Sequence, residues 1–223
     1  GVQHIVLGIG GSATCDAGRG MLEALRRQLT TPWGVRLSVA CDVRNPLFGP
    51  DGAAYVFAPQ KGATPQQVEW LDDQLRRFAH ETEDKGLATP CDALLPGTGA
   101  AGGLGYALLT YLKAELKPGI EVVLDALRFD EVVQGADCVL TGEGCSDRQT
   151  LMGKVPQGVL HRAQRQGVPV VLMSGAIRDA EVLHDAGFQR IVCINEGDSR
   201  PLEVLLSPHV ASENITQAVR LIM

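Results

Sequence analysis

Glycines, hydroxyls and acids follow the first apolar run of the chain, residues 4–9. This run is aliphatic and β-branched and predicts a buried strand. Loops and helix N-termini converge at the carboxyl ends of parallel strands, where their free N–H groups bind anions. The segment therefore predicts an anion-binding loop, with a tight strand-to-helix turn as the alternative. The residues predicted to bind the anion are Gly10, Gly11, Ser12 and Thr14.

A second glycine-rich segment, residues 96–103, directly precedes an apolar helical pattern. Glycines leave N–H groups uncovered at the positive end of a helix dipole, which suits a phosphate or a carboxylate. The alternative is close packing of the helix through small residues. The segment is not a P-loop, because no Gly-Lys-Ser/Thr follows it. Its candidate ligand-binding residues are Gly97, Gly99, Gly102 and Gly103.

The first loop also fits the dinucleotide-binding pattern G-x-G-x-x-A through Gly8, Gly10 and Ala13. That pattern requires an acid about 20 residues further on, at the end of a second strand, and none is clearly present there. Asp16 also places a negative charge beside the loop. A simple anion-binding loop is therefore favoured over NAD binding.

Charged residues stand at several of the predicted strand ends. Chemistry on a nucleoside triphosphate requires a divalent cation, held by one or two carboxylates together with phosphate oxygens, and positive groups that offset the phosphate charge. A single Asp after a strand is more often a helix N-cap, and a lone Lys is often a solvated surface residue, so these alternatives remain. The candidate acids are Asp42, Glu143, Asp147 and Asp16, and the candidate cations are Lys61 and Lys154.

Short β-branched runs alternate with helical patterns, which is typical of parallel strands joined by helical crossovers in an α/β fold. The clearest helix begins behind Thr64, which forms a capping box with Gln67 and precedes Pro65 at the first helical position. The other predicted helices cover residues 104–112, 157–165 and 213–221. In the helix at 213–221, Ile215 belongs to an apolar stripe that is expected to face the core. The predicted strands cover residues 4–9, 35–40, 137–141, 168–173 and 190–194.

Composition limits the function classes. The chain has 223 residues, enough for one large or two small domains, and a net charge of −6. It has no basic run longer than a pair, which argues against a nucleic-acid or anionic membrane surface, and no apolar stretch of roughly 18 residues that could span a bilayer. Six cysteines without C-x-x-C spacing predict buried free thiols and a reducing, cytoplasmic location.

Five strings resemble, in order and over almost the whole chain, the bacterial glycerate kinases of glyoxylate and sugar-acid catabolism. They are GIGGSATCD (8–16), ACDVRNPL (40–47), FAPQKG (57–62), PGTGAAGG (96–103) and TGEG (141–144), the last followed by Asp147, Gln149, Gly153, Lys154 and Pro156.

The resemblance implies ATP-dependent phosphorylation of D-glycerate to 2-phosphoglycerate, with 3-phosphoglycerate as the other product to consider, and Mg²⁺ as the metal. It also implies two dissimilar α/β domains. Residues 1–40 and 120–223 are expected to form a Rossmann- or flavodoxin-like domain with a parallel sheet, and residues 41–119 part of a second, inserted domain.

ATP and glycerate are the partners that the resemblance implies; no nucleic acid or membrane is expected, and a homodimer is allowed. Phosphate charge would be neutralised by loop N–H groups with Lys61 or Lys154, magnesium held by Glu143 or Asp147, and the glycerate hydroxyl oriented or deprotonated by Asp42 or Asp16.

The chain departs from the family pattern at Cys145, where Arg is expected, and two motifs that open the family sequence do not occur in it. Replacing Arg removes a planar cation suited to phosphate or carboxylate. One alternative is therefore a non-catalytic regulatory protein that binds a nucleotide or hydroxy acid on the same scaffold. An NAD-dependent oxidoreductase is the other.

Overall fold

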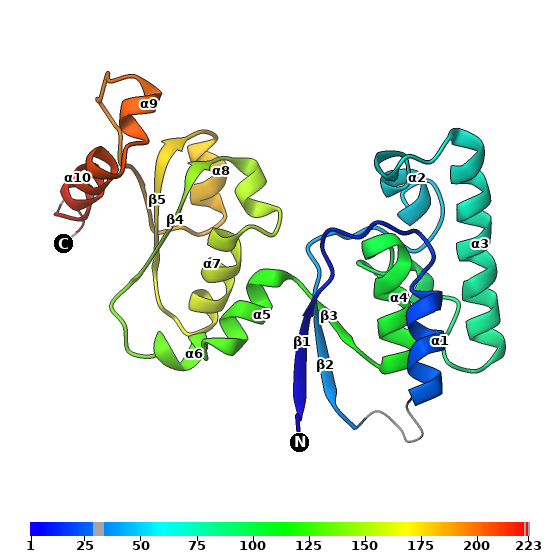
Figure 1. The fold of residues 1–223 in the computed structure, drawn as a ribbon. Helices are drawn as coiled ribbons and strands as arrows, with labels where there is room; N and C mark the ends of the chain where they lie inside the picture. Colours follow the sequence, from blue (N-terminus) through cyan, green and yellow to red (C-terminus); the bar gives the residue numbers. More distant parts are fainter. Residues whose placement is uncertain (29–33, 221, 223) are drawn as a thin grey trace. The chain divides into compact units, whose positions relative to one another are not determined.

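The computed structural model describes residues 1–28, 34–220 and 222, and the chain divides into two compact units, Gly1–Val122 and Val123–Met223. Each unit is an α/β structure with a three-stranded parallel sheet (Figure 1). The predicted α/β class is therefore confirmed. The first unit holds residues 1–40 together with 41–119. The predicted grouping of residues 1–40 with 120–223 differs from this division, and the inserted arrangement stays a prediction.

The sheet of the first unit has the order β1 (His4–Gly8), β2 (Arg36–Ala40), β3 (Glu115–Lys117). Gly8 pairs with Ala40, so the carboxyl ends of β1 and β2 are level and the loops that follow them start from the same edge. The sequence predicted β1 and β2 but not β3. That strand has only three residues, too few for an alternating pattern to be recognised.

Helices α1 (Arg19–Gln28) and α4 (Ala100–Leu112) lie on one side of this sheet, with α3 (Pro65–Asp84) beyond them (Figure 1). The predicted capping box of α3 is confirmed: Gln67 N donates to Thr64 Oγ1 over 3.3 Å, and Thr64 N donates to Gln67 Oε1 over 2.8 Å. Its apolar face carries Phe78 into the main core. The shorter elements of this unit are α2 (Ala53–Phe57), η1 (Pro59–Lys61) and η2 (Asp92–Leu94), and α5 (Gly119–Ala126) contains the division.

The second unit has the sheet order β4 (Val139–Ser146), β5 (Val170–Ile177), β6 (Arg190–Cys193). Helix α7 (Val155–Arg165) packs on β4 and β5, and α8 (Ala180–Asp185) on β6. The remaining elements are α6 (Phe129–Val132), η3 (Arg148–Leu151), α9 (Leu202–Leu205) and α10 (Pro208–Arg220).

Two expectations about this unit were wrong. Residues 142–146 were predicted to be a loop, but they continue β4. The glycine there serves strand pairing, because a Cβ on Gly142 would lie 2.1 Å from Met173 O of β5. Ile215 was predicted to face the core, yet 45% of it is exposed, whereas Ala218 on the same helix is buried. The last residue of that predicted helix, Leu221, lies outside the described residues.

No helix in the described ranges has the length and apolar character needed to cross a bilayer. The six cysteines are free thiols in the structure, as predicted. The prediction that they are buried was wrong, because Cys91 and Cys138 are exposed and the other four are half-buried.

Candidate functional site

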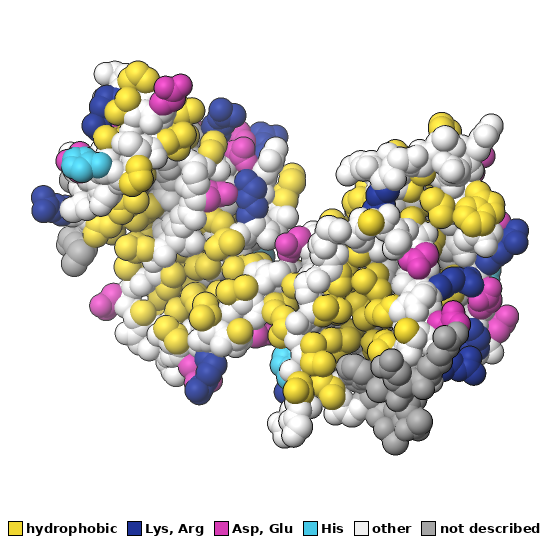
Figure 2. Space-filling model, in the orientation of Figure 1, with side chains coloured by type: hydrophobic (Ala, Val, Ile, Leu, Met, Phe, Trp, Pro, Cys, Tyr) yellow, Lys and Arg dark blue, Asp and Glu magenta, His cyan; other side chains and the backbone are white. Residues whose placement is uncertain are grey.

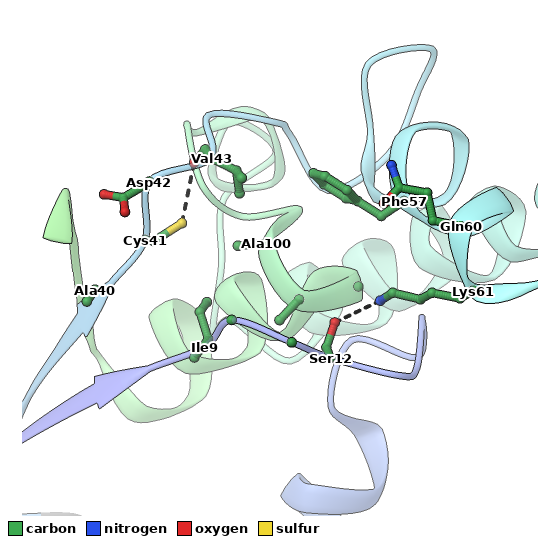
Figure 3. Close-up of a pocket in the computed structure, with 14 residues that line it drawn as sticks. Ile9, Ser12, Ala40, Cys41, Asp42, Val43, Phe57, Gln60, Lys61 and Ala100 are labelled. Carbon is green, nitrogen blue, oxygen red and sulfur yellow. Dashed lines mark hydrogen bonds between the residues drawn. The ribbon is translucent and has the colours of Figure 1, made fainter. Parts of the chain in front are cut away.

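A cavity of about 470 Å³ lies where β1 and β2 of the first unit end. Its walls come from residues 9–12 after β1, residues 40–43 at and after β2, and residues 100–102 at the start of α4. Phe57, Gln60 and Lys61 complete it (Figure 3). The strand-end location that the sequence predicted for a ligand site is thus hollow in the structure.

Lys61 and the first glycine loop form the positive part of this cavity. The Nζ of Lys61 donates to Ser12 Oγ over 2.8 Å and to Thr14 O over 2.5 Å (Figure 3). The backbone N–H groups of Gly10, Gly11 and Ser12 have no acceptor among the described residues. Uncovered N–H groups beside an ammonium group are suited to an anion such as phosphate. Thr14 contributes to this arrangement through its carbonyl oxygen, which holds the lysine.

The loop geometry places Lys61. It is the last residue of η1, and Gly62 behind it reverses the chain with a φ of 93° that favours glycine. Lys61 is half-buried, and two hydrogen bonds of its ammonium group hold its charge beside Ser12 and Thr14.

Asp42 lies in the cavity wall, but its carboxylate is engaged elsewhere. Gly119 N, the first N–H of α5, donates to Asp42 Oδ1 over 2.7 Å. In the close-up the carboxylate points away from Lys61 (Figure 3). Asp16 does not line the cavity, and its Oδ1 accepts from Gly18 N over 3.3 Å, just before α1. Asp42 therefore binds an N–H group at a helix N-terminus, and Asp16 binds one in the turn before α1. The catalytic roles of both acids stay predictions.

The second glycine-rich segment mostly serves packing. A Cβ on Gly99 would lie 2.1 Å from Pro46 O, and one on Gly103 would lie 2.8 Å from the side chain of Leu47. Gly97 has a φ of 91° and is buried, as are the other two. None of the three lines the cavity.

Gly102 is the exception, because it lines the cavity next to Ala101. It is also a packing glycine: a Cβ there would lie 2.1 Å from Thr14 O, and its own carbonyl oxygen accepts from Ala17 N over 2.9 Å. The anion-binding role predicted for these four glycines is untested, while the packing alternative has direct geometric support.

In the second unit, Glu143 is the centre of a polar cluster. Its Oε1 accepts from Thr150 Oγ1 over 2.5 Å and from Ser146 Oγ over 3.1 Å. Its Oε2 lies 3.4 Å from the Nζ of Lys154. The hydroxyl of Ser146 in turn lies 2.5 Å from that of buried Ser174. The cluster orders Lys154, the residue that precedes α7, although its side chain remains 42% exposed.

The predicted magnesium ligands fit a metal unequally. Glu143 uses both carboxylate oxygens for protein contacts, so it could bind a cation only after losing some of them. Asp147 caps η3 by accepting from Gln149 N over 2.8 Å, which leaves further lone pairs on its carboxylate. No group of three or more His, Cys, Asp or Glu side chains that could hold a metal occurs among the described residues. A magnesium ion that arrives on phosphates needs only one or two carboxylates, so the metal-binding roles of Asp147 and Glu143 stay predictions.

Comparison with known proteins supplies the family. The profile of the "Glycerate kinase family" matches residues 1–34 and 26–223 of the chain. The chain belongs to the glycerate kinase family. Glycerate kinase of Bacillus subtilis is 42% identical over 91% of this chain and 60% of its own length. Glycerate 2-kinase of Escherichia coli is 38% identical over 87% of this chain and 58% of its own length.

A crystal structure from Salmonella typhimurium LT2, described as a glycerate kinase 2, matches with a TM-score of 0.66 and 39% identity over 85% of this chain and 55% of that one. The chain therefore spans between half and two thirds of the length of these family members. These relatives do not favour the alternative of a non-catalytic binding protein.

The sequence did not single out several residues that line this cavity, and three of them have side chains that could contact a ligand. These are Cys41, next to Asp42 in the chain, Gln60, next to Lys61, and Phe57, four residues before Lys61. Cys41 Sγ donates to Val43 O over 3.3 Å (Figure 3), and burial raises the pKa of this thiol. Cys41 therefore stays neutral and adds no negative charge to an anion site. An apolar thiol and a phenylalanine have no sequence signal for ligand binding, because both are also ordinary core residues.

Proposed function

We propose that the full-length protein transfers a phosphoryl group from ATP to D-glycerate and forms 2-phosphoglycerate. The observation that carries this proposal is the pairing of Lys61 with the unengaged N–H groups of the first glycine loop, at the edge of a cavity large enough for a small molecule. The family membership and the name of the Escherichia coli relative support the substrate and the position that is phosphorylated.

Phosphoryl transfer depends mainly on positioning and on stabilising the charge of the phosphate oxygens. In this proposal, the N–H groups of Gly10, Gly11 and Ser12 and the ammonium of Lys61 hold an ATP phosphate. Asp42, which borders the same cavity, orients the glycerate hydroxyl or accepts its proton once its bond to Gly119 is exchanged. Asp16 is the weaker candidate, because it lies outside the cavity walls.

The proposal for the second unit concerns Lys154 and Asp147. Lys154 is a second cation for phosphate charge, and Glu143 holds it in place by an ion pair. Asp147 is the side chain proposed to hold Mg²⁺, whose role when bound is to neutralise phosphate charge. We propose further that the protein is cytoplasmic, which its six free thiols support, and that ATP and glycerate, rather than nucleic acid or a membrane, are its partners.

A coupled ADP-release assay on the full-length gene product tests this function. The reactions contain ATP and Mg²⁺ with D-glycerate, with L-glycerate, or with neither. ADP release that depends on D-glycerate is the expected result, and ³¹P NMR of the product separates 2-phosphoglycerate from 3-phosphoglycerate. Glycerate or ATP binding without ADP release would contradict the proposal and revive the regulatory alternative. In that case the first residue to change is Cys145→Arg.

A further inference from the structure

A second hollow of about 310 Å³ lies in the first unit and shares Lys61 with the cavity just described. Its apolar walls are Ala58, Ala63 and Leu71, and Trp70 and Gln67 of α3 stand at its side. The volume is at the lower end of the range for small-molecule sites, roughly 300–1,000 Å³. It has room for a compact ring system.

Trp70 is the unusual residue of this hollow. Trp70 is 61% exposed, whereas Phe78, two turns further along α3, is 4% exposed and belongs to the core. An exposed indole beside a hollow offers a flat apolar face on which a heteroaromatic ring can stack. Leu71 packs against the main core and therefore gives this wall a fixed position.

The side-chain amide of Gln67 can donate hydrogen bonds to a ligand. Its Oε1 already accepts from Thr64 N in the capping box. The amide nitrogen has no acceptor among the described residues, so its two N–H groups remain for a ligand. Purine rings carry unprotonated nitrogens at their edges, which accept hydrogen bonds of this kind. An aliphatic ligand would leave both the indole face and these donors unused.

The charges around the hollow fit a ligand with an anionic tail. Lys61 lines both cavities, and its ammonium lies at Ser12, on the side of the unengaged loop N–H groups. Burial raises the pKa of the Cys15 thiol, so this neighbour is uncharged at neutral pH. Asp72 on α3 is buried and engaged by Gly49 N, and it does not line the hollow. The exposed acids Asp16, next to Cys15, and Glu69, next to Trp70, do not line the hollow.

We infer that this hollow binds the purine base of the nucleotide whose phosphates are held by Lys61 and the first glycine loop. Trp70 stacks on the base and Gln67 donates to its edge. The inference rests on the proposed function for the presence of a nucleotide, and it adds where the base lies and which residues select it.

Tryptophan emission and calorimetry of the full-length protein test this inference. ATP, ADP and adenosine should each quench emission, and Trp70→Phe should abolish that quenching. Trp70→Ala should weaken ATP binding about tenfold or more, as expected when a base loses its aromatic stacking partner. Glu69→Ala, an exposed neighbour on α3 that does not line the hollow, should bind ATP as the unchanged protein does.

Inorganic tripolyphosphate separates the base from the phosphates. It should bind the Trp70→Ala variant and the unchanged protein equally, because it has no base. An unchanged Kd for ATP in Trp70→Ala, or an equal loss of tripolyphosphate affinity, would overturn the inference.

The ADP-release assay separates this inference from the proposed reaction. Turnover of D-glycerate with an unchanged KM for ATP in Trp70→Ala would remove the base site and leave the reaction standing. Quenching by ATP through Trp70 without any turnover would support the base site and remove the reaction.

Discussion

The glycine-rich segments at residues 10–12 and 97–103 have similar composition but different surroundings. In the first, a Cβ on Gly10 or Gly11 would meet no atom within 4 Å, and the N–H groups have no acceptor among the described residues. In the second, a Cβ on Gly99 or Gly102 would lie 2.1 Å from a backbone oxygen, and Gly99 N donates to Asn45 O over 2.9 Å. One segment leaves its backbone open to a ligand, and the other brings two pieces of backbone into contact.

This difference shows why glycine content alone does not identify a phosphate site. Glycine permits both an uncovered N–H group and a close backbone approach, and the sequence looks the same in both cases. What separates them is the partner that lies opposite, which comes from a distant part of the chain. Lys61 stands opposite the first segment, and Pro46 and Thr14 stand opposite the second.

The change with the largest expected effect is Lys61→Met in the full-length protein. It keeps much of the side-chain volume and removes the charge that we place on an ATP phosphate. We expect kcat/KM for D-glycerate phosphorylation to fall about a hundredfold or more, as when one preorganised donor to a reacting group is lost. The coupled ADP-release assay measures this effect.

Lys85→Met is the matched control, because Lys85 is an exposed lysine that does not line this cavity. It should keep normal turnover. The thermal unfolding midpoint of Lys61→Met should stay close to that of the unchanged protein. Normal turnover in Lys61→Met would show that the first glycine segment is not an anion site and would remove its contrast with the second.

Alanine at one glycine of each segment tests the comparison through stability. Gly102→Ala places a methyl group against Thr14 O at a φ of 68°, so we expect unfolding to become easier by about 3 kcal/mol. Gly10→Ala meets open space and should change stability by less than about 1 kcal/mol. Urea denaturation followed by circular dichroism measures both. Equal losses in the two variants would mean that the segments do not differ as the geometry indicates.

Local signals made much of the fold predictable from the sequence. Thr64 and Gln67 predicted the start of α3 correctly, because a capping box is formed by residues that are close in the sequence. Strand β4 was predicted too short, because Gly142 was interpreted as the start of a loop. A glycine is needed at this position because Met173 of β5 lies close to it, and no local sequence pattern contains that contact. Ile215 was misplaced for a similar reason, since a helical stripe does not say which part of it finds a partner.

The candidate site was predictable in its location but not in its details. The strand-end rule led to Gly10, Ser12 and Asp42, all of which line the cavity. The sequence could not show that Asp42 accepts from Gly119, because these residues are far apart in the chain. For the same reason the sequence could not show that Glu143 contacts two hydroxyls and Lys154, and its metal-binding role stays a prediction.

The smallest expected effect concerns Tyr106, in the helix that follows the second segment. Its side chain is fully buried, and its hydroxyl has no hydrogen-bond partner within the described part of the chain. Tyr106→Phe removes a buried polar group that lacks a partner, so we expect stability to rise by about 1 kcal/mol and turnover to stay unchanged. A lower unfolding midpoint would show that the hydroxyl has a function in this packing region.

The pH dependence of unfolding gives an independent measurement on the same variant. Burial raises the pKa of Tyr106 from 10.0 to about 12. Below pH 10 the phenol is protonated in both the folded and the unfolded chain and adds no pH dependence. Between pH 10 and about 12 the unfolded chain loses this proton while the folded chain keeps it, so stability falls as the pH rises. Tyr106→Phe should lack this part of the alkaline loss, and an identical alkaline profile in both proteins would show that the phenol is not held protonated by burial.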